Sequence, residues 1–91
     1  MDTLFKALAD KNRREILKLL KKRSMNVTEL LEHFSITPAT LSHHLDALKR
    51  ADLIVAERRG QFINYSLNES VFQEATELLF NLFKIDNKDE K

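Results

Sequence analysis

The chain has 91 residues, of which 43% are hydrophobic and 32% are charged, and its formal net charge is +1. This length suits one small domain, and the balance of hydrophobic and charged residues argues against bulk disorder. Because the chain has no cysteine, disulfide bridges, thiolate metal sites and cysteine nucleophiles are excluded.

The distribution of apolar and charged residues along the chain indicates where the protein is located and which partners it can bind. No apolar run approaches the roughly 20 residues that a membrane-spanning helix needs, and the first residues lack the apolar segment of a signal peptide. We therefore expect a cytoplasmic protein with no membrane partner. Residues 1–23 carry eight lysines and arginines against three acidic residues, whereas residues 67–91 are acidic. This asymmetry fits either an orientation on a polyanion or two ordinary solvated helix surfaces.

Two helices are predicted in the first quarter of the chain. Apolar residues with helical spacing predict a helix over about residues 2–9, and Asp10 is placed to cap a second helix over about residues 11–23. The second helix has one apolar side, and the rest of its surface is strongly basic. For Arg13 and Arg14 two interpretations stay open, ordinary solvation and contact with a phosphate.

The next two helices form a predicted helix-turn-helix. Asn26 followed by Glu29 resembles a capping box, which predicts a short helix over about residues 27–34. About three residues then lead to a helix over residues 38–50, with Thr37 as its N-cap and Pro38 at its first position. Two helices with such a short connection are typical of a helix-turn-helix, although a serine stands where the turn glycine is usual.

The helix over residues 38–50 has one face suited to packing and one suited to a ligand. Leu41, Leu45 and Leu48 form a narrow apolar stripe. The opposite face is small and polar near its N-terminus, as a helix that enters the major groove must be. Here His43 points outward, whereas His44 lies beside the leucine stripe and is expected to pack.

A hairpin follows the helix-turn-helix. Strands are predicted over residues 53–57 and 61–67, with Arg58, Arg59 and the single glycine, Gly60, between them. Glycine accepts the positive φ of a tight hairpin turn. Since a two-stranded hairpin is unstable alone, it must pack on the helices. A basic hairpin in this place is the wing of a winged helix.

The last predicted helix begins after Asn68 and covers about residues 69–85, so the domain is expected to span residues 1–85 and a polar tail residues 86–91. Its apolar arc is wider than a surface helix needs. The first and last helices either complete the core of the chain or build a two-fold dimer interface, and we favour the dimer. Its predicted residues are Leu4, Phe5, Leu8, Phe72, Leu79, Phe80, Leu82 and Phe83.

Three segments together resemble one protein family. Residues 41–54, LSHHLDALKRADLI, are similar to the recognition-helix signature of the ArsR/SmtB family of bacterial winged-helix repressors. Residues 5–17 resemble its N-terminal signature, and residues 58–67 resemble its wing. The resemblance implies a mainly α fold with a small β-hairpin, in the order four helices, two strands and a helix. It also implies homodimers that pair through the first and last helices and bind palindromic operators.

The chain departs from the metal-sensing members of that family. These carry cysteines on the third helix, or histidines and carboxylates on the last helix, and this chain has neither; its histidines are His33, His43 and His44. No metal and no other cofactor is expected, and the pattern is most similar to the metal-free, SdpR-like branch.

The predicted function is that of a sequence-specific regulator of transcription, a homodimeric repressor that occludes a palindromic operator in double-stranded DNA. The alternative is a winged-helix module that binds a protein partner and no DNA. An enzyme is not expected, because the chain has no Gly-rich phosphate loop and no HExxH motif, and the sequence identifies no effector. The predicted DNA contacts are Thr37, Pro38, Ala39, Thr40, Ser42, His43, Arg58, Arg59 and Gln61.

Overall fold

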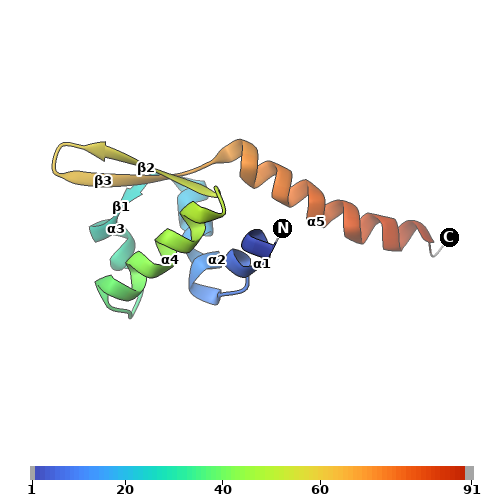
Figure 1. Ribbon diagram of the computed structural model, residues 1–91, viewed down its shortest axis with the longest axis horizontal. Helices are drawn as coiled ribbons and strands as arrows, with labels where there is room; N and C mark the ends of the chain where they lie inside the picture. Colours follow the sequence, from blue (N-terminus) through green and yellow to red (C-terminus); the bar gives the residue numbers. More distant parts are fainter. Residues whose placement is uncertain (1, 90–91) are drawn as a thin grey trace.

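The computed structural model describes the backbone of residues 2–89 and the side chains of residues 2–84. The elements follow in the order α1 (Asp2–Leu8), α2 (Lys11–Lys22), β1 (Met25–Asn26), α3 (Val27–Leu31), α4 (Pro38–Arg50), β2 (Ile54–Arg59), β3 (Phe62–Leu67) and α5 (Glu69–Asp89). Helices α1 to α4 form a body, the β2–β3 hairpin lies along it, and α5 extends away from it (Figure 1). This confirms the predicted mainly α fold with a winged helix-turn-helix.

The core is built from the apolar stripes of the short helices. The largest fully buried side chains are Ile16, Leu30, Leu41, Leu45, Leu48 and Leu53. The predicted leucine stripe of α4 is therefore confirmed. Burying one such side chain contributes about 1.5–3 kcal/mol, so α4 is anchored to the body by its inner face, which leaves the outer face free.

The predicted helix caps are present. The Asp10 carboxylate accepts from the backbone N–H of Asn12 at 2.7 Å and of Arg13 at 3.2 Å. Asn26 and Glu29 form both bonds of a capping box, at 2.8 and 2.9 Å. Each cap satisfies backbone donors that have no partner within the helix, so the N-termini of α2 and α3 are set by local chemistry.

Helix α3 is shorter than predicted, ending at Leu31 and not near residue 34. The backbone N–H of His33 bonds the carbonyl of Leu30 at 3.0 Å, and that of Phe34 bonds Leu31 at 3.1 Å. These i→i−3 bonds replace the i→i−4 pattern and tighten the end of the helix. The apolar Phe34 still packs against the core, which explains why its spacing resembled a continuing helix.

The sheet has three strands, whereas the sequence predicted a hairpin of two. Strand β1 pairs antiparallel with β3, with Met25 opposite Tyr65 and Asn26 opposite Asn64, so the strand order is β1-β3-β2. A strand of two residues has no periodicity to recognise. Strand β1 forms because Met25 is buried and because Met25 and Asn26 pair with β3, a segment that is distant in the sequence.

The wing turn is also tighter than predicted. Arg58 and Arg59 belong to β2, and Arg59 pairs with Phe62, which leaves only Gly60 and Gln61 in the turn. Gly60 has a φ of +63°, as predicted for the glycine. A positive φ at the first turn residue suits a type II′ turn, whose twist matches that of the flanking strands.

Helix α5 runs to Asp89, beyond the predicted end near residue 85, and residues 90 and 91 of the predicted tail lie outside the described residues. Val71, Phe72 and Ala75 in its first half pack on the core. The second half leaves the body, which makes the molecule 55 Å long and only 24 Å wide. Within the described part of the chain, none of the helices combines the length and apolar character needed to cross a bilayer.

Candidate nucleic-acid interface

The N-terminal half of α4 presents the predicted polar surface. All six predicted contact residues of this helix and its cap are exposed, namely Thr37, Pro38, Ala39, Thr40, Ser42 and His43. Leu41 and Leu45, on the opposite side, are 0% and 1% exposed. The exposed side chains are short, so the backbone of α4 can approach a surface closely, as a helix in the major groove must.

The hydroxyls at the start of α4 are partly committed within the chain. Thr37 Oγ1 accepts from the backbone N–H of Thr40 at 3.1 Å and donates to Thr40 Oγ1 at 2.9 Å. Thr37 is therefore the cap that the sequence predicted. Because Thr37 donates in this pair, the hydroxyl proton of Thr40 remains available to a base edge or a phosphate.

The two adjacent histidines have different surroundings. His43 is exposed, and His44 is buried with 6% of its surface exposed, as predicted for each. Their ring centroids lie 6.0 Å apart. His43 is thus free for a ligand, whereas His44 belongs to the packing of the body.

Arg13 joins α1, α2 and α4. Its guanidinium donates to the carbonyl of Ala7 at 2.9 Å and of Lys6 at 2.7 Å, and it lies 3.3 Å from His44 Nδ1. Nε2 of His44 lies 3.9 Å from a carboxylate oxygen of Asp10, so the His44 ring stands between the Arg13 guanidinium and the Asp10 carboxylate. These contacts favour a structural role for Arg13 over the phosphate contact considered from the sequence.

The Asp10 carboxylate completes this network. Burial by itself raises the pKa of Asp10, but the backbone N–H groups of Arg13 and Asn12, followed by His44 and the Arg13 charge, hold that pKa below its ordinary value. Sequence reasoning identified Asp10 as a cap but missed the link to α4. The signal lies in residues that are far apart in the chain, so no local pattern shows it.

Two arginines of the wing, for which the sequence predicted the same role, differ in their ion pairing. Arg59 binds Glu57 through two contacts of 3.1 and 3.3 Å, because residues two apart in a strand share a face. Arg58 lies on the other face, the one that includes buried Ile54, and it has no ion pair with any of residues 2–84. Arg58 is therefore the less neutralised cation of the wing, and Gln61 is exposed beside it in the turn.

The polar end of α4 and the wing tip lie at one end of the long axis, and the C-terminal end of α5 lies at the other (Figure 1). The predicted contact residues of the helix and the hairpin are thus brought to the same end of the molecule. Asp46 and Glu57 add negative charge near this end, although the charge of Glu57 is offset by Arg59.

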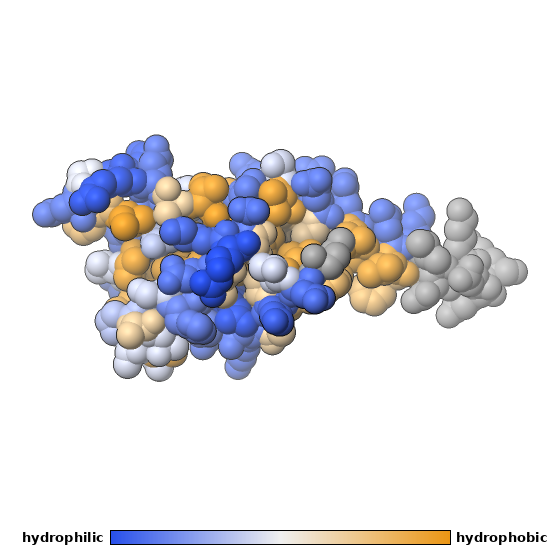
Figure 2. Space-filling model, viewed as in Figure 1, coloured by the Kyte–Doolittle hydropathy of each residue, from blue (hydrophilic) through white to orange (hydrophobic). Residues whose placement is uncertain are grey.

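The residues predicted for a dimer interface divide into two groups. Leu4, Leu8 and Phe72 are partly buried against the core, and Leu79 is half-buried as well. Phe5, Phe80, Leu82 and Phe83 are exposed, by 44%, 63%, 49% and 68%. Apolar surface continues along α5 where this helix leaves the body (Figure 2). The apolar arc of α5 therefore exceeds what the core of one chain uses.

Comparison with known proteins agrees with this arrangement. The profile of the family described as bacterial regulatory protein, arsR family, matches residues 10–55. Transcriptional repressor SdpR of Bacillus subtilis is 43% identical over 98% of this chain and 99% of its own length. The arsenical resistance operon repressor of Staphylococcus aureus is 33% identical over 97% of this chain and 84% of its own length.

Solved structures show the same fold. A possible transcriptional regulator for arsenical resistance has a TM-score of 0.81 at 30% identity, over 99% of this chain and 92% of its own. HlyU from Vibrio cholerae has a TM-score of 0.73 at 31% identity, over 89% and 88% of the two chains. With the profile covering the helix-turn-helix and its relatives covering nearly the whole length, the chain belongs to the arsR family of bacterial regulatory proteins and is a DNA-binding regulator of transcription.

Proposed function

We propose that the protein is a homodimeric repressor that reads a palindromic operator with α4 and the β2–β3 wing and prevents transcription by occupying that site. The observation that carries this proposal is the exposed, short-side-chain face of α4, held against the core by a fully buried leucine stripe. The names of the relatives from Bacillus subtilis and Staphylococcus aureus, both repressors, support it.

In this proposal α4 supplies the sequence specificity. Ser42, His43 and the free proton of Thr40 form hydrogen bonds with base edges in the major groove, while Thr37 stays with the helix cap. The wing adds Arg58 and Gln61 at the minor groove or the flanking phosphates. Phosphate contacts give affinity and register, and base contacts give specificity.

The homodimer forms through α1 and α5, whose exposed phenylalanines become buried between the two chains. A two-fold axis then places two α4 helices about 34 Å apart, one turn of the double helix. Each helix reads one half of a palindrome. No separate effector-binding or activation domain is needed, because occupation of the operator excludes other proteins.

Selection of bound sequences from random duplexes, followed by titration of the selected site, tests the proposal. His43→Ala is expected to lower the ratio of operator to random-DNA affinity, by about 1–3 kcal/mol for a good base contact. His33→Ala is the matched control, since His33 is exposed outside the proposed contacts. A selection without a consensus, or equal losses on operator and random DNA, would contradict the proposal. A protein partner that persists after nuclease treatment would favour an interaction module.

A further inference from the structure

A hollow opens between α2 and the first half of α5, and none of the predicted DNA-contact residues lines it. Its volume is about 320 Å³, within the range of small-molecule sites. Helices α1, α2 and α5 and Leu53, directly before β2, all contribute to its lining. Its lining includes Leu17, Lys18 and Lys21 of α2, together with Leu8, Phe72 and Leu79, which are also among the residues predicted for the dimer interface.

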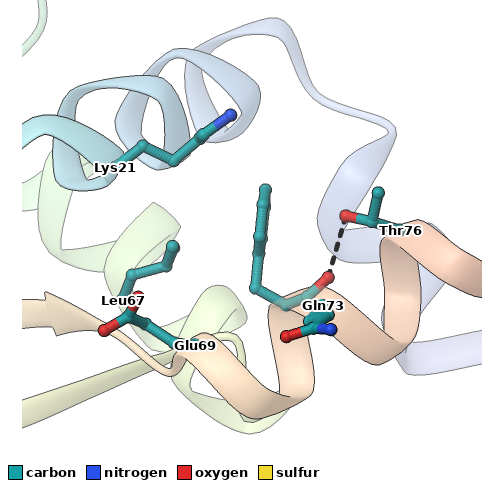
Figure 3. A pocket seen from close by; sticks show the side chains of 6 residues that line it. Lys21, Leu67, Glu69, Gln73 and Thr76 are labelled. Carbon is teal, nitrogen blue, oxygen red and sulfur yellow. Dashed lines mark hydrogen bonds between the residues drawn. The ribbon is translucent and has the colours of Figure 1, made fainter.

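The floor of this hollow is apolar and rigid. Leu17, Leu53 and Ala75 are 4%, 0% and 8% exposed, so they belong to the core and offer a fixed surface. The hydroxyl of Thr76 is satisfied by the carbonyl of Phe72 at 2.9 Å, as Figure 3 shows for the adjoining hollow that shares Lys21, Phe72 and Thr76. An apolar group would therefore fit the floor without leaving a polar atom unpaired.

The charged residues that the described part of the chain contributes to the rim of the hollow are all basic. Arg14, Lys18 and Lys21 stand four and three residues apart on α2, so they share one face of the helix. Among residues 2–84, whose side chains the structure describes, no acidic residue lines this hollow. Lys18 is largely exposed and reaches Glu15 only at 4.0 Å, and Lys21 Nζ lies 5.8 Å from the centre of the Phe72 ring. These ammonium groups are available to an anion.

We propose that this hollow binds a small amphipathic organic anion, with its apolar body on Leu17 and Phe72, above the fully buried Leu53, and its carboxylate between Lys18 and Lys21. The charge pattern selects this class of ligand over a neutral or cationic one of equal size. The adjoining hollow includes Glu69, so the carboxylate is directed to the α2 side.

The position of the hollow suggests an effector role, which rests on the proposed function. Leu53 lies in the short connection from α4, which ends at Arg50, to β2. Its carbonyl accepts from the N–H of Asn68 at 2.9 Å, just before α5. A ligand wedged between α2 and α5 changes the angle at which α5 leaves the body. In a dimer joined through α5, this changes the separation of the two α4 helices and weakens operator binding.

Decanoate titration of the full chain, followed by amide NMR spectra without DNA, tests the site. We expect saturable shifts at Leu17, Leu53 and Thr76, and much weaker ones with 1-decanol, which has the same tail and no charge. Lys18→Gln should weaken decanoate binding about two- to fivefold, the scale of an exposed ion pair. Lys22→Gln is the matched control on the same helix, because Lys22 does not line the hollow, and it should leave binding unchanged.

Three results would overturn the site: no saturable shift at millimolar decanoate, equal binding of decanol, or equal effects of the two lysine variants. Shifts that appear only when Phe83→Ser separates the chains would show that a second copy fills the hollow.

The effector role is tested by adding decanoate to the operator complex. If decanoate binds without changing operator affinity, the effector role fails. If no operator is found while decanoate still binds, the proposed function fails and the site stands.

Discussion

Arg58 and Arg59, adjacent residues of the wing, differ in electrostatic surroundings. Arg59 is paired with Glu57 and Arg58 is not paired within residues 2–84. Arg58→Ala is expected to reduce the slope of log affinity against log salt by roughly one unit. Arg59→Ala should reduce it by less, because an arginine already neutralised by Glu57 releases fewer counterions from DNA. Titration of the operator at several salt concentrations measures both slopes. Equal reductions would show that DNA breaks the Glu57–Arg59 pair.

The lowered pKa of Asp10 predicts a contribution to acid stability. Its pKa in the folded protein is below the ordinary value, so the charged form is favoured by folding. The resulting stabilisation is present above the unfolded pKa of about 3.9 and is lost as the pH falls through the folded value. Urea unfolding should therefore be measured at a series of pH values from pH 6 downwards. The free energy of unfolding should fall more steeply with decreasing pH for the wild type than for Asp10→Asn.

Asn is also a good N-cap, so Asp10→Asn keeps the hydrogen bonds of the cap and removes the titration. Glu69→Gln, at an exposed position of α5, serves as the control for loss of one carboxylate. If the pH profiles of the wild type and Asp10→Asn run parallel, the lowered pKa of Asp10 does not contribute to stability.

At the scale of one element, the C-terminus of α4 ends in a Schellman motif. The N–H of Asp52 bonds the carbonyl of Lys49 at 2.9 Å, and the N–H of Leu53 bonds that of Leu48 at 3.1 Å. Asp52 occupies the left-handed position of this motif with a φ of +60°, where glycine is usual. The chain thus accepts local strain where α4 passes into the buried Leu53.

Asp52→Gly is expected to raise the free energy of unfolding by up to about 1 kcal/mol, because glycine adopts this φ without a steric penalty. Asp52→Ala, in contrast, should lower it, since alanine is less tolerant of the left-handed region. Thermal or urea unfolding of the two variants against the wild type gives the order. If alanine were as stable as glycine at this position, the strain would be absent.

For the whole molecule, the exposed phenylalanines of α5 predict its assembly. Phe83 is 68% exposed and lies in the second half of α5. Phe83→Ser is expected to raise the Kd of the dimer at least about tenfold, because burial of one phenylalanine contributes about 1.5–3 kcal/mol. Operator affinity should fall with it. Sedimentation velocity over a range of concentrations measures the equilibrium.

Val55→Ser is the control for this experiment, since Val55 is an apolar residue of the wing that is 46% exposed and lies outside the predicted interface. It should leave the dimer unchanged. A monomeric wild type at all accessible concentrations would contradict the proposed assembly, and an effect of Val55→Ser equal to that of Phe83→Ser would place the interface elsewhere.

The sequence by itself determined the features that depend on neighbours within one turn of helix or one tight turn. The caps Asp10 and Thr37 and the leucine stripe of α4 follow from interactions between residues three or four apart, and Gly60 follows from the φ of its turn. Such contacts form in the same way wherever the segment occurs. The helix-turn-helix and the polar face of α4 were therefore predictable.

The tertiary structure alone decided what depends on distant partners. Strand β1 exists only by pairing with β3, about 40 residues away, and Arg13 meets His44 across a separation of 31 residues. The difference between Arg58 and Arg59 required the register of the hairpin, since a shift of one residue exchanges the two faces of a strand. The hollow between α2 and α5 likewise depends on how two separate helices pack. Local patterns contain none of this information, because the energies that select these contacts arise only when the chain is folded.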